Sequence, residues 1–395
     1  MAEIIHTQES LRVAFAGGGT GGHLMPGIAL ADELCEMAPD TRCLFLHTSR
    51  DAERAYGNAL SRFSTACLPD LRWQSLSQKL RFGPDSVTCL ADTLEAFGRF
   101  APHAVVGLGG SSCVIPVAAA RALSVPVLLL ESNATPGAAV RLLAPWVDSV
   151  QVQWRATATQ LGMSRCTMSG IPVRRRVFQG ERSRALPRFG LSPRRYTLLA
   201  MGGSQGALSL NKTLLATLKG SPLPREKLQV LHLTGSEHIA EARRFAAPEG
   251  LLYRPVGYLE DIEDAYAAAD LVLCRAGGST LAELTAMGKP SVLVPYPHAT
   301  DNHQRTNAEV LADRGAARCV AESELTADRL SSLLSTMLEN PLSLRRMADS
   351  ARRLGHPAAA RTIACELHSM TGRGRVEGMG NTGEGYSQTD VSHAA

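Results

Sequence analysis

The chain alternates short apolar runs with longer amphipathic segments, and this alternation constrains its fold more than any other feature. Strand-like runs occupy residues 11–16, 42–47, 104–108, 125–130 and 147–152, and a second series occupies residues 196–201, 228–233, 271–274, 291–294 and 317–320. Helix-like segments such as residues 26–37, 207–218, 280–287 and 304–313 lie between them. Alternating strands and helices favour parallel sheets with helices on both faces. Because ten strands exceed an ordinary sheet, we predict an α/β chain with two doubly wound, Rossmann-like αβα domains.

The domain boundaries are predicted from length and composition. A chain of 395 residues is long enough for two or three domains of about 150 residues each. Residues 165–195 carry nine arginines and one acidic residue, Glu181, which is typical of a linker and the entry to a second domain. We therefore place the domains at residues 1–170 and 171–355. We also expect a C-terminal helix at 356–370 that packs back on the first domain. The polar, glycine-rich residues 371–395 are predicted to be a disordered tail.

Composition excludes several classes of protein. Hydrophobic residues make up 45% and charged residues 20%, as in globular proteins, and a net charge of +4 is too small for a dedicated nucleic-acid binder. The nine cysteines are at least eight residues apart, so no zinc-ligand spacing occurs, and we interpret them as buried thiols of a cytosolic protein. The sequence has no signal-peptide pattern and no apolar run of about 18 residues.

Three glycine-rich loops each follow a predicted strand and open a helix. They are AGGGTGGHLMPG at residues 16–27, MGGSQGA at 201–207 and RAGGSTLAE at 275–283. A helix N-terminus has unpaired N–H groups and a partial positive charge, and glycine lets a phosphate or a sugar hydroxyl approach them closely. One such loop is explained equally well by a tight turn. Three of them at the carboxyl ends of strands favour a ligand site, because open α/β sheets bind ligands there.

The first loop also satisfies the dinucleotide pattern GxGxxG through Gly17, Gly19 and Gly22. That pattern needs an acidic residue at the end of the second strand, whereas this strand ends near Thr48 and Asp51 follows late. The dinucleotide interpretation is weakened, and a nicotinamide- or flavin-dependent oxidoreductase remains one alternative. A phosphate-binding P-loop is excluded because His23 stands where that motif needs lysine.

Several side chains near the loops allow both a structural and a chemical interpretation. His23 is either a capping or packing residue or a general base, since histidine titrates near neutral pH. Glu283 completes a capping-box pattern with Thr280, but a carboxylate at a helix start also accepts two ribose hydroxyls. Ser204 and Ser279 are N-caps, phosphate donors or both.

Two further side chains lie close to predicted strand ends or bends. Asn133 follows a buried strand and either forms an Asx turn or contacts sugar hydroxyls through its amide. Arg174 follows the bend at Pro172 and is a candidate for binding a diphosphate, whereas its arginine neighbours are expected to be solvated. The polar segment 301–304 is expected to face the same inter-domain cleft.

Five motifs in this order and spacing resemble the MurG family of peptidoglycan glycosyltransferases. They are GGGTGGHLMPGIALA, GLGGSSC, MGGSQGALSLN, CRAGGSTLAEL and DNHQRTNA, and the resemblance extends from about Leu11 to Leu367. It implies the GT-B fold, in which two Rossmann-like domains face each other across a cleft. It also implies transfer of N-acetylglucosamine, with inversion and without a cofactor or metal, from UDP-N-acetylglucosamine to the C4 hydroxyl of the muramoyl group of lipid I. The product is lipid II, a precursor of peptidoglycan.

The resemblance also implies roles for individual residues. His23 is our candidate for the general base. The implied contacts with the donor are Thr20, Gly21, Gly22, Asn133, Arg174, Ser204, Leu259, Gly278, Ser279, Thr280, Leu281, Ala282, Glu283 and Gln304. The chain departs from the family pattern at residues 131–133, where the family often has HEQN, and at residues 109–113. A sugar-nucleotide or lipid binder without turnover is the second alternative.

The lipid acceptor implies contact with a membrane. We expect a peripheral position on the cytoplasmic face of the bacterial membrane, against anionic lipid. Apolar residues next to basic ones in one segment suit such an interface, although packing on the first domain explains them equally well. These residues are Leu71, Trp73, Leu76, Leu80 and Phe82 with Arg72, Lys79 and Arg81.

Overall fold

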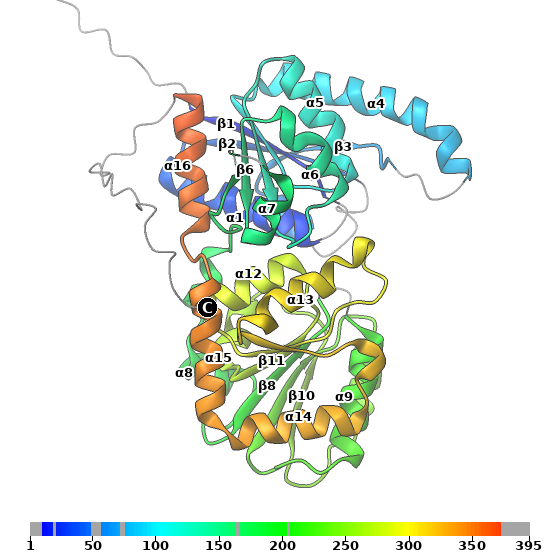
Figure 1. Cartoon of the computed structure of the whole chain (residues 1–395), viewed down its shortest axis with the longest axis vertical. Helices are drawn as coiled ribbons and strands as arrows, with labels where there is room; N and C mark the ends of the chain where they lie inside the picture. Colours follow the sequence, from blue (N-terminus) through cyan, green and yellow to red (C-terminus); the bar gives the residue numbers. More distant parts are fainter. Residues whose placement is uncertain are drawn as a thin grey trace, which may run out of the picture.

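The computed structural model describes residues 10–18, 21–48, 57–71, 76–162, 164, 166–203 and 206–372. These residues form two separate sheets, one above the other in Figure 1, and every strand pairs in parallel. The first sheet has the strand order β3-β2-β1-β4-β5-β6-β7, and the second has the order β10-β9-β8-β11-β12-β13. The predicted fold class, two doubly wound α/β domains, is confirmed.

The strands are short. In the first sheet they are β1 Arg12–Ala16, β2 Arg42–Thr48, β3 Ser64–Leu68, β4 Ala104–Gly107, β5 Val127–Glu131, β6 Ser149–Val152 and β7 Cys166–Thr167. In the second sheet they are β8 Tyr196–Met201, β9 Leu228–Leu233, β10 Leu252–Val256, β11 Leu271–Cys274, β12 Ser291–Leu293 and β13 Ala317–Cys319. Along β1, Val13 belongs to one hydrophobic cluster and Ala14 to another, so helices bury both faces of the sheet.

The helices connect successive strands. In the first domain they are α1 Gly21–Met37, α3 Gly57–Leu60, α4 Leu76–Phe100, α5 Val114–Ala122, α6 Ala138–Leu143 and α7 Arg155–Leu161. The second part of the chain contains α8 Arg182–Arg188, α9 Leu208–Gly220, α10 Ile239–Arg244, α11 Ile262–Ala268, α12 Gly278–Met287, α13 His303–Asp313, α14 Ala327–Glu339, α15 Pro341–Leu354 and α16 Ala359–Thr371. Short 3₁₀ segments are η1 Ser111–Cys113, η2 Ala144–Trp146, η3 Arg175–Gln179, η4 Thr300–Asn302 and η5 Glu322–Glu324. None of the described helices is long and apolar enough to span a membrane.

Three strands were not predicted, and all three lie at sheet edges. β3 and β7 are the outer strands of the first sheet and β10 is an outer strand of the second. β3 is largely exposed, β7 has two residues, and β10 contains Arg254 and Pro255. An edge strand needs only one neighbour and tolerates proline and polar residues, so it lacks the continuous apolar run of a central strand.

The arginine-rich segment differs from the predicted linker, because much of it folds into η3 and α8. Arg184 Nη2 and Arg188 Nη1 donate to the two oxygens of Asp264 on α11, at 2.9 and 2.6 Å. Arg182 Nη2 donates to Asp270 at 3.0 Å, and Arg175 pairs with Glu36 on α1. The local positive charge is therefore balanced by acidic residues from distant parts of the sequence.

The chain crosses between the domains twice, and the two crossings touch. Gly170 lies in the first crossing with φ of +79°, and a Cβ there would lie 2.2 Å from the Cβ of His356 in the second. After the second crossing, α16 lies beside the first sheet and packs on α1 (Figure 1). Glu366 of α16 accepts hydrogen bonds from Ser149 Oγ at 2.5 Å and Gln151 Nε2 at 2.6 Å, both on β6. Residues 373–395, most of the predicted tail, lie outside the described part.

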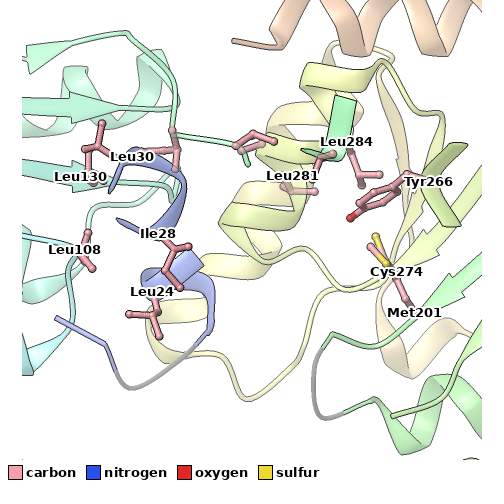
Figure 2. Packing of buried hydrophobic residues seen from close by; sticks show 14 of the residues in the cluster. Leu24, Ile28, Leu30, Leu108, Leu130, Met201, Tyr266, Cys274, Leu281 and Leu284 are labelled. Carbon is pink, nitrogen blue, oxygen red and sulfur yellow. The ribbon is translucent and has the colours of Figure 1, made fainter. Parts of the chain in front are cut away.

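The apolar core also crosses the domain boundary. Figure 2 shows Leu24 and Ile28 of α1 on one side and Leu281 and Leu284 of α12 on the other. All four belong to one hydrophobic cluster, and α1 packs directly on α12. The helices that follow the first and third glycine loops therefore hold the two domains together.

Candidate active site

The glycine loops follow adjacent strands at the centre of each sheet. β1 and β4 are neighbours in the first sheet, and β8 and β11 are neighbours in the second. The strand order changes direction between the members of each pair. Ligands of open α/β sheets bind at such points, beyond the carboxyl ends of the strands. All three loops occupy this position, as predicted.

His23 lies between the first glycine loop and the loop after β4. It is the third residue of α1, which begins at Gly21, earlier than predicted, so His23 belongs to the first helical turn. A Cβ at Gly109 would lie 3.2 Å from the His23 Cδ2, and a Cβ at Gly17 would lie 2.7 Å from the Gly109 carbonyl oxygen. Both glycines have positive φ, of +90° and +128°. Glycine at these two positions lets the loops approach each other and the imidazole closely.

The remaining contacts predicted in the first loop are only partly described. Gly21 and Gly22 are the first two residues of α1, where backbone N–H groups have no partner within the helix. Thr20 lies outside the described residues. The described first turn thus offers backbone donors next to His23.

The second glycine loop is held by a buried polar chain. A Cβ at Gly206, which has φ of +78°, would lie 2.2 Å from the Thr234 carbonyl oxygen. Asn211 Nδ2 donates to the same oxygen at 2.8 Å, so Asn211 Oδ1 accepts from His232 Nε2 at 3.0 Å. His232 Nδ1 then accepts from the Tyr253 hydroxyl at 2.8 Å. Burial lowers the pKa of His232 to about 4, which keeps the ring neutral for this arrangement. Ser204 lies outside the described residues.

The third loop leads into α12, whose N-terminus is capped by the backbone at Gly277 and by no side chain. Gly277 is the N-cap, and no side chain accepts a hydrogen bond there. Thr280 is the third helical residue and Glu283 the sixth, so the capping-box interpretation of this pair is wrong. Gly278, Ser279 and Thr280 form the first turn and present backbone N–H groups without helical partners.

The other predicted contacts on α12 face the core. Leu281 is fully buried and Ala282 is 2% exposed. The Leu281 backbone N–H donates to the Gly277 carbonyl at 3.0 Å, which closes the first helical hydrogen bond. Neither side chain is available to a ligand in this conformation. Within this segment, the first turn of α12 therefore keeps backbone N–H groups without helical partners.

Gln304 is fixed beside the third loop. Its Oε1 accepts from the backbone N–H groups of Ala276 at 3.2 Å and Tyr296 at 2.9 Å. No described residue accepts from its Nε2, so this amide group remains a donor for a ligand. Leu259 lies in the loop between β10 and α11 and is half-buried against the main hydrophobic cluster.

Glu283 and Arg174 contact each other. Arg174 Nη2 lies 3.7 Å from Glu283 Oε1, with the two side chains only 13% and 15% exposed. The Tyr266 hydroxyl donates to the other carboxylate oxygen of Glu283, Oε2, at 2.8 Å. Burial raises the pKa of Glu283, and Arg174 and Tyr266 oppose that shift. The Arg174 Nε is buried and has no partner among the described residues.

Asn133 takes part in a polar cluster that joins the domains. Its Nδ2 donates to Glu131 Oε1 at 3.0 Å, and its Oδ1 accepts from Asn307 Nδ2 of α13 at 3.0 Å. Asn307 Nδ2 also donates to the Ala276 carbonyl at 3.1 Å, and its Oδ1 accepts from the Ala134 N–H at 2.7 Å. Asn307 is fully buried. The cluster brings Asn133 of the first domain next to the third glycine loop of the second.

Three residues of the site were missed from the sequence. Tyr266, Asn307 and Glu131 each act through a partner on another element. Glu131 is 4% exposed and accepts from the backbone N–H groups of Asn133 at 2.8 Å and Gly137 at 2.7 Å. Burial raises its pKa, while these donors favour its charged form. A glutamate at the end of an apolar strand was a signal for such a role.

The predicted membrane segment is described only in part. Leu71 is 7% exposed and belongs to a core cluster of the first domain, so its predicted interfacial position is wrong. Trp73 lies outside the described residues, and the side chains of residues 76–82 are not described. Further along α4, Val87, Leu90 and Leu94 are 69%, 41% and 42% exposed. Their spacing of three and four residues places them on one face of the helix.

Among the described residues, no group of three histidine, cysteine, aspartate or glutamate side chains is arranged to hold a metal ion. The groups that converge near the site are instead glycine-loop amides, one histidine, one arginine and several amide or carboxylate side chains.

Comparison with known proteins identifies the family. Residues 13–152 match the glycosyltransferase family 28 N-terminal domain, and residues 197–363 match the family 28 C-terminal domain. The chain is 35% identical over 363 residues to the UDP-N-acetylglucosamine–N-acetylmuramyl-(pentapeptide) pyrophosphoryl-undecaprenol N-acetylglucosamine transferase of Desulforamulus reducens, covering 89% of this chain and 97% of the relative. It is also 35% identical over 360 residues to the transferase of the same name from Desulfitobacterium hafniense, with the same coverage of both chains.

A solved structure agrees with these matches. The crystal structure of Acinetobacter baumannii MurG superposes with a TM-score of 0.71 at 26% sequence identity, covering 91% of this chain and 99% of that one. The fold, the two matched domains and the full-length relatives lead to one assignment. The chain belongs to glycosyltransferase family 28 and, within it, to the MurG family of N-acetylglucosaminyltransferases with the GT-B fold.

Proposed function

We propose that the protein transfers N-acetylglucosamine from UDP-N-acetylglucosamine to the C4 hydroxyl of the muramoyl group of lipid I, with inversion, to form lipid II. The observation that carries this proposal is the family assignment over nearly the whole chain, together with the position of three glycine loops at the carboxyl ends of the central strands of both sheets. The second domain binds the donor, and the first domain supplies the base and binds the acceptor.

Donor binding uses the loops of the second domain. Glu283 accepts the ribose hydroxyls, and the first turn of α12 presents N–H groups to the diphosphate. Arg174 is a second diphosphate contact, since its Nε is buried without a partner among the described residues. Gln304 and Asn133 bind the sugar. Gln304 has a spare amide nitrogen, and Asn133 keeps one N–H beyond its bond to Glu131. Ser204 and Leu259 complete the proposed nucleotide site.

The chemical step is a single displacement. The acceptor oxygen forms a bond to the anomeric carbon on the face opposite UDP, and the bond from that carbon to the β-phosphate oxygen breaks. His23 removes the proton of the attacking hydroxyl. The negative charge that develops on UDP is stabilised by helix N-termini and by Arg174. Gly21 and Gly22 share the first turn of α1 with His23, and in this proposal they and Thr20 contact the donor.

The same proposal places the protein at the cytoplasmic face of the bacterial membrane as a peripheral protein. The exposed apolar side chains of Val87, Leu90 and Leu94 support a lipid-facing surface on α4, which also includes Leu76, Leu80 and Phe82 of the predicted membrane segment. The protein should sediment with anionic vesicles at low salt and be released as salt screens the charges. Replacing Trp73, Leu76 and Phe82 with serine should reduce this binding; retention that is unchanged would assign the segment to ordinary packing.

The transfer activity is tested directly. The protein is incubated with UDP-N-acetylglucosamine and a soluble lipid I analogue, and disaccharide product and UDP are quantified. Inversion is read from the anomeric coupling constant of the product by NMR. Binding of the sugar nucleotide without product would favour a binding protein, and bound nicotinamide or flavin absorbance would favour an oxidoreductase.

A further inference from the structure

Tyr266 is buried in an apolar environment that does not need its hydroxyl. The residue is 1% exposed, and Figure 2 shows its ring beside Cys274 and Leu284. Phenylalanine would provide the same packing. A buried hydroxyl costs free energy unless it is hydrogen bonded, and this hydroxyl donates to Glu283 Oε2 at 2.8 Å.

That hydrogen bond restricts the carboxylate of Glu283. The side chain comes from the second turn of α12, and without Tyr266 its last torsion would be held only by the more distant Arg174, at 3.7 Å. Each carboxylate oxygen accepts two hydrogen bonds. Tyr266 fills one position on Oε2, and the other oxygen, Oε1, lies 3.7 Å from Arg174 Nη2.

In the structure, Arg174 and Glu283 therefore contact each other, and each occupies the position of a ligand group that the other would bind. The guanidinium contacts the carboxylate where ribose hydroxyls would bind, and it keeps a buried Nε without a described acceptor. A diphosphate supplies that acceptor, and a vicinal diol supplies donors to Glu283. Binding of a nucleoside diphosphate satisfies both groups at once, provided that the carboxylate keeps its orientation.

We propose that Tyr266 is a positioning residue for the nucleotide donor, which orients the Glu283 carboxylate toward the two ribose hydroxyls. The proposal rests on the proposed function, since it assumes that Glu283 binds the ribose. It adds that the affinity for a ribonucleotide depends on a hydroxyl that does not itself touch the ligand.

The test compares Tyr266→Phe with Tyr253→Phe. Tyr253 is a matched control, because it is also buried and its hydroxyl also makes one hydrogen bond of 2.8 Å, to His232. Binding of UDP and of 2′,3′-dideoxy-UDP, which lacks the ribose hydroxyls, is measured by calorimetry. Tyr266→Phe should weaken UDP binding roughly tenfold, as expected for one hydrogen bond to a charged group, and leave dideoxy-UDP binding unchanged. Tyr253 supports the second glycine loop and not Glu283, so Tyr253→Phe should change both affinities alike and leave their ratio as in the wild type.

The ratio of the two dissociation constants is internal to each protein, so a general loss of stability does not change it. Glu283→Gln provides a second variant of similar size, which should also reduce the preference for UDP over dideoxy-UDP. If Tyr266→Phe weakens both ligands equally, or keeps the wild-type ratio, the positioning role is overturned.

A pH profile gives an independent readout. The charged groups that face Glu283 are Arg174 and Arg176, and the titratable ones are Tyr266 and Cys274. Loss of the Tyr266 hydroxyl removes a donor to the charged carboxylate and raises the pKa of Glu283. As the pH is lowered, UDP affinity should therefore begin to fall at a higher pH in Tyr266→Phe than in the wild type. Coincident pH profiles of UDP affinity would contradict the proposal. UDP binding with these differences but without disaccharide formation would refute the transfer activity alone, whereas absence of UDP binding would refute both.

Discussion

Replacement of Asn307 should separate the contribution of the inter-domain cluster from that of the two domain cores. In Asn307→Ala, three groups lose their partner: the Ala134 N–H, the Asn133 Oδ1 and the Ala276 carbonyl. The side chain is fully buried, so water does not replace these bonds while the domains stay in contact. At about 1–1.5 kcal/mol for each hydrogen bond, the expected loss is about 3–5 kcal/mol. This is a large part of the about 5–15 kcal/mol that stabilises a typical protein.

The loss is measured by calorimetry and by small-angle X-ray scattering. At about 2–4 °C for each kcal/mol in a domain of this size, the midpoint of thermal unfolding should fall by roughly 6–20 °C. Alternatively, the two domains of the variant separate, and water then forms hydrogen bonds with the three unpaired groups. A smaller thermal loss should therefore be accompanied by a larger radius of gyration, and UDP-N-acetylglucosamine should restore the compact form at higher concentrations than in the wild type.

Asn340→Ala is the control for this experiment. Asn340 lies in the same domain and is the N-cap of α15, where its Oδ1 accepts one hydrogen bond from the Ser343 N–H at 3.0 Å. Removal of one exposed cap costs about 1 kcal/mol. If Asn307→Ala loses no more stability than Asn340→Ala and keeps the wild-type radius of gyration, the cluster does not hold the domains together.

Three other outcomes are expected. His23→Ala should lower kcat by about 10²–10⁴-fold with little change in donor affinity, and the acidic limb of the pH–rate profile should disappear; a nearly normal rate would assign the base to another residue. His232 has a folded pKa of about 4, below its unfolded value of about 6.5, so the unfolded state binds more protons between these pH values. The free energy of unfolding should therefore fall by about 3 kcal/mol as the pH drops through this window. In His232→Gln, the free energy of unfolding, measured by urea titration at each pH, should depend on pH with a slope smaller by about one proton. Gly278→Ala should lower transfer activity, because its Cβ would lie 2.4 Å from the Ser132 Oγ of the first domain, and a second substitution, Ser132→Gly, should partly restore the activity. Gly220→Ala is the control, because its Cβ would meet nothing within 4 Å. Equal activities of the two alanine variants would show that the structure around Gly278 accommodates a Cβ without loss.

The central strands were predictable from sequence because both of their faces are buried. β1, β4 and β8 consist almost entirely of buried apolar residues, which appear in the sequence as continuous apolar runs. The edge strands β3 and β10 carry exposed or polar residues, so no such run marks them. The starts of α1 and α12 were placed late because their first residues are glycines, which in isolation favour loops over helices.

The parts of the candidate site that a local sequence motif marks were predictable. The parts that depend on contacts between residues far apart in the sequence were not. The glycine loops predicted the carboxyl ends of the central strands in both sheets, and the order of the motifs identified the family. Tyr266 looks like an ordinary core aromatic residue of an amphipathic helix, and its role depends on Glu283, 17 residues later. Asn307 looks like a polar helix residue, and its role depends on Asn133, 174 residues earlier. Interactions at such separations leave no periodic pattern in a single sequence.

The return of α16 to the first domain has a consequence for biosynthesis. The second sheet is inserted between β7 and α16, so the first domain is built from two segments separated by almost half of the chain. Ser149 and Gln151 of β6 leave the ribosome more than 200 residues before their partner Glu366. During this interval the second domain is synthesised and has all of its own strands available for folding. The N-terminal domain, which begins first, is therefore completed last, and a nascent chain stalled before α16 exposes the surface of α1 that this helix covers.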